Sequence, residues 1–471
     1  MPDKDISSLI KRYQQAHESG KNPYFDADEF SDLAEYFDSI DELDTAREII
    51  DAGLAIHPGN TPLLIKKAKL AVYDGEYELA LELLDSSSEY DFDLYLLKIE
   101  CYLQLEQYQD AFALSEELLE KEDDEPLDNV LAELGFLHVE ADCFKEAVLY
   151  LQESLKHNPE NIEVLSDLAY AHEMLGDFEA AIDATNKILD IEPYTYEAWV
   201  SLGKLYSLKE QFEKAIDAFD FALTINDADG NVLKLKAHCL SLVDRVGEAI
   251  EIFNDLLLSD PDDTSIHFLL AECYEALEMY DEALTCLQKY EDIEGETTEL
   301  LCKRAYIYLG KGDYQKALAI VEKGLKDNPY SLDLNMIAGE VEFLREEYKE
   351  AELYYLSIYS QNKENFQLLD RLAMVYIKEE DYQQAAFYTE KLLELDPTNL
   401  AVKQRLALLY FELGDEVEFN IILDQFTDKE LLSLFELIYT PQSPAYFDRD
   451  MLLAYLNKAR EARTLFKNLK Y

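Results

Sequence analysis

One spacing constrains this chain more than any other feature: an alanine recurs every 34 residues over eight consecutive positions. A glycine or alanine also stands twelve residues before each of these alanines. Self-similarity at a fixed period of this length indicates one short structural unit that stacks on copies of itself. The recurring alanines are Ala147, Ala181, Ala215, Ala249, Ala283, Ala317, Ala351 and Ala385, and their small partners are Gly135, Ala169, Gly203, Ala237, Ala271, Ala305, Gly339 and Ala373.

The segment from Leu202 to Phe219, "LGKLYSLKEQFEKAIDAF", indicates what the unit is. Two small residues, Gly203 and Ala215, allow two short antiparallel helices to approach closely, and the aromatic residues between and beside them fill the remaining space. Many units end at a proline, which cannot continue the second helix. These prolines are Pro159, Pro193, Pro261, Pro329 and Pro397.

The pattern resembles the tetratricopeptide repeat, a helix–turn–helix unit with small residues at its eighth and twentieth positions. One unit carries the family pattern nearly in full, through Trp199, Leu202, Gly203, Tyr206, Ala215, Phe219 and Ala222. The resemblance covers most of the chain. It implies an all-α fold, a right-handed superhelical solenoid of antiparallel helix pairs with about eleven or twelve repeats.

The regularity of the spacing divides the chain into four predicted segments. Upstream, the steps from Ala46 to Ala80, Ala111 and Ala147 are 34, 31 and 36 residues, and polar connectors at 85–93 and 120–126 fall at the uneven steps. We expect the superhelix to kink there. The segments are an N-terminal helix or cap (1–25), irregularly spaced repeats (26–126), a regular array (127–426) and a C-terminal linker with a capping helix (427–471).

The formal net charge of −59 restricts the partners. Such a field repels phosphate backbones and anionic lipids, so we expect neither nucleic acid nor a membrane surface as a partner. A basic protein surface is the electrostatic complement, and the alternative is a solvated face that keeps the array in solution. The six cysteines show no metal-binding or disulfide spacing and the N-terminus carries no apolar signal segment, which predicts a cytoplasmic protein.

No catalytic motif is present, so the chain is predicted not to be an enzyme and to use no cofactor or metal. Phosphate-binding glycine loops, a nucleophile elbow and a two-histidine zinc motif are all missing from the sequence. His138 and His172 share one repeat position where the family favours an aromatic residue, so both are interpreted as packing residues.

A binding surface is the better candidate for function. In resembling proteins, positions 2, 5, 9 and 12 of each first helix line a concave groove, because these offsets place four side chains on one helix face. Read from Glu163 onward, the positions give a small basic island and then apolar residues that alternate with carboxylates; the alternative is that adjacent helices shade these apolar residues. The candidate groove residues are Tyr170, Glu173, Lys204, Lys234, His238, Phe268, Glu272, Tyr306, Met336, Glu340, Phe343 and Met374.

Two further features bear on the ligand. The lysine and asparagine clamp of chaperone-docking relatives is incomplete, since His238 and Phe268 stand where polar clamp residues are needed. After the break "TPQSP" at Thr440–Pro444, residues 451–471 form a basic amphipathic helix. This helix is interpreted as a cap on the array, or alternatively as a self-docked segment that a basic ligand displaces.

The sequence therefore predicts a non-catalytic scaffold that binds a protein or peptide segment of basic and apolar character in its groove. A rigid structural subunit that joins partners through its ends or convex face is the alternative, and a regulatory subunit of an enzyme complex is a third possibility.

Overall fold

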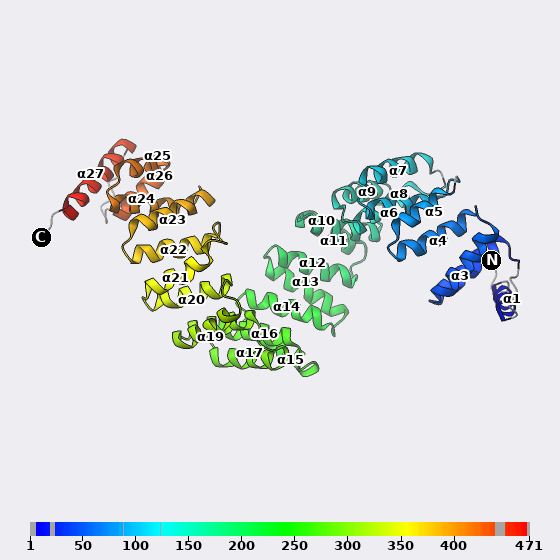
Figure 1. The fold of residues 1–471 in the computed structure, drawn as a ribbon, viewed down its shortest axis with the longest axis horizontal. Coiled ribbons are helices and arrows are strands. Elements are labelled where there is room, and N and C mark those ends of the chain that lie inside the picture. The colour runs from blue at the N-terminus through cyan, green and yellow to red at the C-terminus, as the bar shows by residue number, and fades with distance from the viewer. Residues whose placement is uncertain (1–5, 19–23, 88, 123, 439–447, 469–471) are drawn as a thin grey trace. The chain divides into compact units, whose positions relative to one another are not determined.

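The computed structural model describes residues 6–18, 24–87, 89–122, 124–438 and 448–468, with the backbone alone at 16–18 and 464–468. Over these residues the chain forms helices and no strand, so the all-α fold is confirmed (Figure 1). Packing divides the chain into two units, Met1–Glu248 and Ala249–Tyr471. The predicted boundaries at 25, 126 and 426 are a different subdivision and stay a prediction, and the predicted linker Thr440–Pro444 and the last residues of the tail, 469–471, lie outside the described residues.

Unit 1 is a succession of short helices. They are α1 (Ile6–Glu18), α2 (Ala27–Ser39), α3 (Leu43–Ile56), α4 (Thr61–Tyr73), α5 (Tyr77–Asp85), α6 (Phe92–Gln104), α7 (Tyr108–Lys121), α8 (Leu127–Glu140), α9 (Phe144–His157), α10 (Ile162–Met174), α11 (Phe178–Ile191), α12 (Tyr196–Leu208), α13 (Phe212–Ile225) and α14 (Gly230–Leu242).

Unit 2 continues the alternation from α15, which crosses the boundary. Its helices are α15 (Val246–Ser259), α16 (Thr264–Ala276), α17 (Tyr280–Glu294), α18 (Thr298–Gly310), α19 (Tyr314–Asp327), α20 (Leu332–Leu344), α21 (Tyr348–Tyr359), α22 (Phe366–Lys378), α23 (Tyr382–Leu395), α24 (Leu400–Leu413), α25 (Glu416–Asp424), α26 (Asp428–Ile438) and α27 (Arg449–Asn468).

The described helices pair within each unit as the alanine spacing predicts. Six helix–turn–helix units, α2/α3 through α12/α13, lie in unit 1, and five, α16/α17 through α24/α25, lie in unit 2. The recurring alanines of both units are fully buried between the paired helices. The close approach is tightest at glycine: a Cβ built on Gly203 would lie 2.4 Å from the Phe219 ring, and one on Gly339 would lie 2.2 Å from the Tyr355 ring. Glycine is therefore needed where the second helix supplies a large aromatic side chain.

Polar side chains fix where most first helices begin. Asn161, Asp229, Asp263, Thr297, Ser331, Asn365 and Asn399 recur at the 34-residue period, and each accepts a hydrogen bond from a backbone N–H in the first turn of its helix. Such N-caps satisfy donors that the helix itself cannot pair.

The turn inside each repeat unit passes through the left-handed backbone region at the same period. From residue 142 to residue 414 the position is held by Asp142, Gly176, Glu210, Asp244, Glu278, Gly312, Glu346, Glu380 and Gly414, all with φ between 57° and 76°. Glycine adopts this conformation without strain, whereas aspartate and glutamate carry a steric cost.

The C-terminal helix α27 packs against α24 and α26 at the end of unit 2. Leu452 and Leu456 are buried, and the guanidinium of Arg460 lies 3.2 Å from the Glu416 carboxylate of α25. The helix thus lies where a terminal cap is expected. Its displacement by a ligand stays a prediction, and the side chains of Phe466 and Lys467 lie outside the described ones.

Candidate functional site: an acidic pocket in the first repeats

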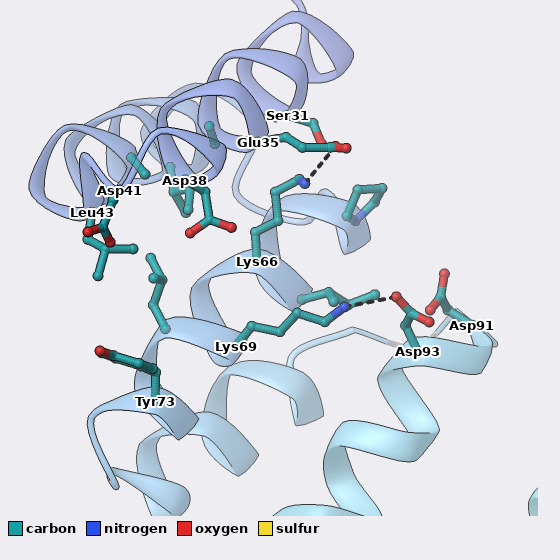
Figure 2. A pocket seen from close by; sticks show the side chains of 16 residues that line it. Ser31, Glu35, Asp38, Asp41, Leu43, Lys66, Lys69, Tyr73, Asp91 and Asp93 are labelled. Atoms are coloured by element: carbon teal, nitrogen blue, oxygen red, sulfur yellow. Dashed lines mark hydrogen bonds and ion pairs between the residues drawn. The ribbon is translucent and has the colours of Figure 1, made fainter. Parts of the chain in front are cut away.

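A pocket of about 780 Å³ opens between α2, α3 and α4 and reaches the start of α6. Figure 2 shows the carboxylates of α2 on one side and Lys66, Lys69 and Tyr73 of α4 on the other. The helices that form it are the first two repeat units and the beginning of the third. Its lining is Ser31, Ala34, Glu35, Asp38, Asp41, Leu43, Ala46, Ile50, Pro62, Ile65, Lys66, Lys69, Leu70, Tyr73, Asp91 and Asp93.

The floor of the pocket is apolar because it belongs to the packing core of the repeats. Ala34 and Ala46 are the small residues of the first repeat and are buried, as are Ile50 and Ile65 beside them. Tyr73 stands at the edge with 76% of its surface exposed. A ligand in the pocket can therefore bury an apolar side chain against carbon atoms already held rigid by helix packing.

Ion pairs hold two of the carboxylates on the rim. Lys66 Nζ lies 3.2 Å from Glu35 Oε2, and Lys69 Nζ lies 3.0 Å from Asp93 Oδ2. Both carboxylate side chains are more than half exposed. Exposed pairs of this kind contribute only about 0–1 kcal/mol, so a cationic ligand can compete for either carboxylate.

Asp38 and Asp41 have no cationic partner among the described residues. Asp38 lies in the last turn of α2, and Asp41 follows the helix in the left-handed region at φ 61°. The C-terminal end of a helix carries a partial negative charge, and no basic residue lies in the last turn of α2 to offset it. A cation placed there would relieve repulsion from both the carboxylates and the helix end.

The sequence contained the signal for this pocket, although the prediction began at Glu163 and missed it. When positions 2, 5, 9 and 12 are read in the first repeat, with Ala34 as position 8, three of them are pocket residues: Ser31, Glu35 and Asp38. The second repeat contributes Pro62, Ile65 and Lys69, and the third contributes Asp93.

The five predicted groove residues of unit 1 lie on α10, α12 and α14. Tyr170 is half exposed and meets the Phe144 ring at 6.0 Å, and Glu173 is half-buried. Lys204 and His238 are exposed, whereas Lys234 is half-buried. The predicted basic island is thus accessible at two of its three positions.

The seven predicted groove residues of unit 2 lie on α16, α18, α20 and α22. Phe268 packs edge-on against Tyr290 at 5.6 Å, and Phe343 packs against Tyr348 at 5.5 Å. Met336 and Met374 are half-buried, and Tyr306 keeps 46% of its surface exposed. Neighbouring helices therefore cover part of this apolar set.

The carboxylates of the same surface are tied to the next repeat. Glu272 Oε1 lies 3.1 Å from Lys303 Nζ, and Glu340 Oε2 lies 3.0 Å from Arg371 Nε. These pairs join successive first helices, α16 to α18 and α20 to α22. Both carboxylates are thereby engaged within the protein.

Two further titratable groups on the first helices of unit 1, His138 and Asp167, have a pKa shifted by burial. His138 lies between the Phe112 and Tyr150 rings, and burial lowers its pKa. Burial, with the nearby charges of Glu140 and Glu163, raises the pKa of Asp167 to about 6. Among the described residues, no three histidine, cysteine, aspartate or glutamate side chains are placed to hold a metal ion.

Comparison with protein families matches four stretches of the chain. Residues 139–205, 302–365 and 366–399 match tetratricopeptide repeat families, and residues 209–290 match the family described as subunit 3 of the anaphase-promoting complex, or cyclosome. The chain is a tetratricopeptide repeat protein, and its repeats make it a protein-interaction scaffold in general character.

Solved structures share local parts of the repeat architecture at low similarity. A tetratricopeptide repeat protein from Parabacteroides merdae is 20% identical over 60% of this chain and 98% of its own, with a TM-score of 0.37. PilF of Pseudomonas aeruginosa is 15% identical over 45% of this chain and 97% of its own, with a TM-score of 0.36. YrrB, described as a TPR protein with an unusual peptide-binding site, is 20% identical over 39% of this chain and 95% of its own, with a TM-score of 0.33.

A comparison with curated proteins finds no match. Among the described residues, no helix has both the length and the apolar character needed to cross a bilayer.

Proposed function

We propose that the chain is a non-catalytic scaffold that binds a basic and apolar segment of a partner protein, and that the acidic pocket of the first repeats is its primary contact. The observation that carries the proposal is the pair Asp38 and Asp41, unpaired at the C-terminal end of α2 above an apolar floor. A lysine or arginine of the partner would meet these carboxylates while a neighbouring apolar side chain is buried beside Ile50 and Ile65.

The chemistry of the rest of the chain supports a basic partner. The net charge of −59 would accelerate the encounter with a cationic segment, and the rim carboxylates Glu35 and Asp93 offer further contacts. The groove residues predicted on α10, α12 and α14 extend the same proposal to a longer segment, with Lys204 and His238 as contacts for an acidic residue within it. Those predicted on α16 to α22 are proposed as contacts within unit 2.

A fluorescein-labelled octapeptide of alternating arginine and leucine tests the pocket by fluorescence anisotropy. The double variant Asp38→Asn/Asp41→Asn is expected to bind about tenfold more weakly, equivalent to about 1.4 kcal/mol. The matched control, Asp32→Asn/Glu48→Gln, removes the same charge from exposed positions of α2 and α3 that do not line the pocket. Equal losses in the two variants would mean that the peptide binds the acidic surface without a site.

A structural subunit of a larger assembly is the second candidate, because residues 209–290 match a family described as a subunit of a multiprotein complex. In this role the ends or the outer face of the repeats join partners and the pocket is incidental. Purification of the tagged chain from its native cell, followed by quantitative mass spectrometry, distinguishes the candidates. A stoichiometric complex that survives Asp38→Asn/Asp41→Asn unchanged supports the structural role.

A further inference from the structure

The outer face of unit 2 carries a row of exposed apolar side chains at one repeat position. Leu353, Phe387 and Ile421 stand 34 residues apart on α21, α23 and α25, and 68%, 43% and 49% of their surfaces are exposed. We call these three residues the outer row. Single exposed apolar residues are common on proteins, but three at equivalent positions of consecutive repeats form a continuous feature.

The helix geometry explains why these side chains face outward. Each lies two residues after a fully buried residue, Ala351, Ala385 or Phe419, which packs against the first helix of its own unit. Two residues turn an α-helix by about 200°, so the outer row points away from the first helices. It is therefore separate from the inner face on which the proposed function rests.

The same position is polar in the preceding repeats, which shows that the fold does not require an apolar residue there. It is held by Asp183, Asp217, Glu251 and Thr285, all exposed, and then by the exposed Ala319. In unit 1 the position has one large apolar residue, Leu149, besides the exposed Ala113. The change to leucine, phenylalanine and isoleucine in the last three repeats is thus confined to one region.

The neighbourhood of the outer row defines what could cover it. The Tyr359 and Tyr388 rings, 5.4 Å apart, bring α21 and α23 side by side. Lys391 Nζ lies 4.9 Å from the centre of the Phe387 ring. Exposed carboxylates edge the row on α21 and α25, namely Glu350, Glu418 and Asp424.

We propose that the outer row binds an amphipathic helix of a partner protein, with apolar anchors on one side and lysine or arginine on the flanks. Residues seven apart lie on nearly the same face of an α-helix, so a helix laid across α21, α23 and α25 can present one apolar anchor to each from a single face. Carboxylates along the row favour the basic flanks, whereas a second copy of the chain brings a charge of −59 and is repelled.

An 18-residue labelled peptide with leucines seven residues apart on one helix face and lysines on the other tests this surface by fluorescence anisotropy. The triple variant Leu353→Gln/Phe387→Gln/Ile421→Gln keeps the charge constant and is expected to bind at least tenfold more weakly. The control Leu149→Gln alters the one large apolar residue at the same repeat position in unit 1 and should change affinity less than twofold. A scrambled peptide of the same composition should bind the wild type at least tenfold more weakly than the amphipathic one.

Further measurements decide between this proposal and its alternatives. Circular dichroism is expected to give the same melting temperature for wild type and triple variant, because all three side chains are exposed. Asp38→Asn/Asp41→Asn should leave this affinity unchanged, which separates the result from that of the pocket. Ala319→Leu, which lengthens the row by one repeat, should strengthen binding severalfold for a 25-residue version of the peptide that carries a fourth leucine at the same spacing.

Two results would overturn the proposal. One is equal binding of the amphipathic peptide by wild type and triple variant. The other is a wild-type dimer in sedimentation that the triple variant converts to a monomer, because a second copy would then be the occupant.

Discussion

The inner faces of the first repeats and of unit 2 use the same repeat positions but differ in how their carboxylates are held. In unit 2, Glu272 and Glu340 are bound by Lys303 and Arg371 of the following first helix. In the first repeats Lys66 and Lys69 of α4 bind Glu35 and Asp93, and Lys67 binds Asp51 of α3. The carboxylates at the end of α2 have no cationic partner among the described residues.

This difference indicates that the repeat fold sets the direction of an inner-face side chain. Whether its carboxylate is already paired depends on a basic residue one repeat away. Asp370 and Arg405, 2.6 Å apart, repeat the arrangement of unit 2 between α22 and α24. An unpaired carboxylate at a groove position is therefore the more available contact for a cationic ligand, whereas a paired one must first exchange its partner.

The largest expected effect is the loss of peptide affinity when a charge in the acidic pocket is reversed. Asp38→Lys places a like charge in front of a basic ligand, and we expect the arginine–leucine octapeptide to bind about 30-fold more weakly, or about 2 kcal/mol. Glu340→Gln, which removes a paired inner-face carboxylate at position 9 of a unit 2 repeat, is expected to change affinity less than threefold. Anisotropy titrations measure both, and a larger loss in the unit 2 variant would reverse the comparison.

The comparison assumes that the two units pack alike, which matched glycine variants test. Gly203→Ala and Gly339→Ala both force an aromatic ring of the second helix to move, and we expect each to lower the free energy of unfolding by about 1–2 kcal/mol despite the better helix propensity of alanine. Urea denaturation measures this. Strongly unequal losses would show that the units differ in packing as well as in charge.

Removing the cationic partners of the unit 2 carboxylates should reduce the difference in peptide binding between the two inner faces. In the background Asp38→Asn/Asp41→Asn, the further changes Lys303→Gln and Arg371→Gln release Glu272 and Glu340, and we expect peptide affinity to recover about fivefold, or about 1 kcal/mol. Lys289→Gln and Lys326→Gln, at exposed positions of α17 and α19, remove the same charge as a control. Equal recovery in the control would assign the effect to net charge alone.

The smallest effect concerns carboxylates of unit 1 that face other carboxylates. Because burial and the charges of Glu140 and Glu163 raise the pKa of Asp167 to about 6, the folded chain binds a proton more tightly than the unfolded chain. Stability is therefore expected to fall as the pH rises from 4 to 7.

Asp167→Asn should remove this part of the pH dependence and stabilise the protein at pH 7 by about 1 kcal/mol, a value reduced from the full shift because the side chain is partly solvated. Thermal melts across this pH range measure the effect. An unchanged slope in the variant would contradict the assignment.

Most of the fold could be predicted from the sequence because the pairing of helices depends on the size of side chains that are close together in the chain. Each small residue and the residue sixteen positions later, such as Gly203 with Phe219, pack against one another inside one unit. The site was harder to predict. The spacing around Ala111 is uneven, so the repeat pattern is weakest near the repeats that form the pocket. The pairing of Glu272 with Lys303 joins residues 31 positions apart, which no local pattern shows.

The turn inside each unit has a consequence for the whole protein. At six of its nine occurrences from residue 142 onward, the left-handed position holds aspartate or glutamate, where glycine would be free of steric strain. Exchange to glycine at Glu278 or Glu346 should gain about 0.5–1 kcal/mol each, after the entropy of glycine is counted. The resistance of the array to thermal unfolding could therefore be raised stepwise, by substituting glycine at one turn after another.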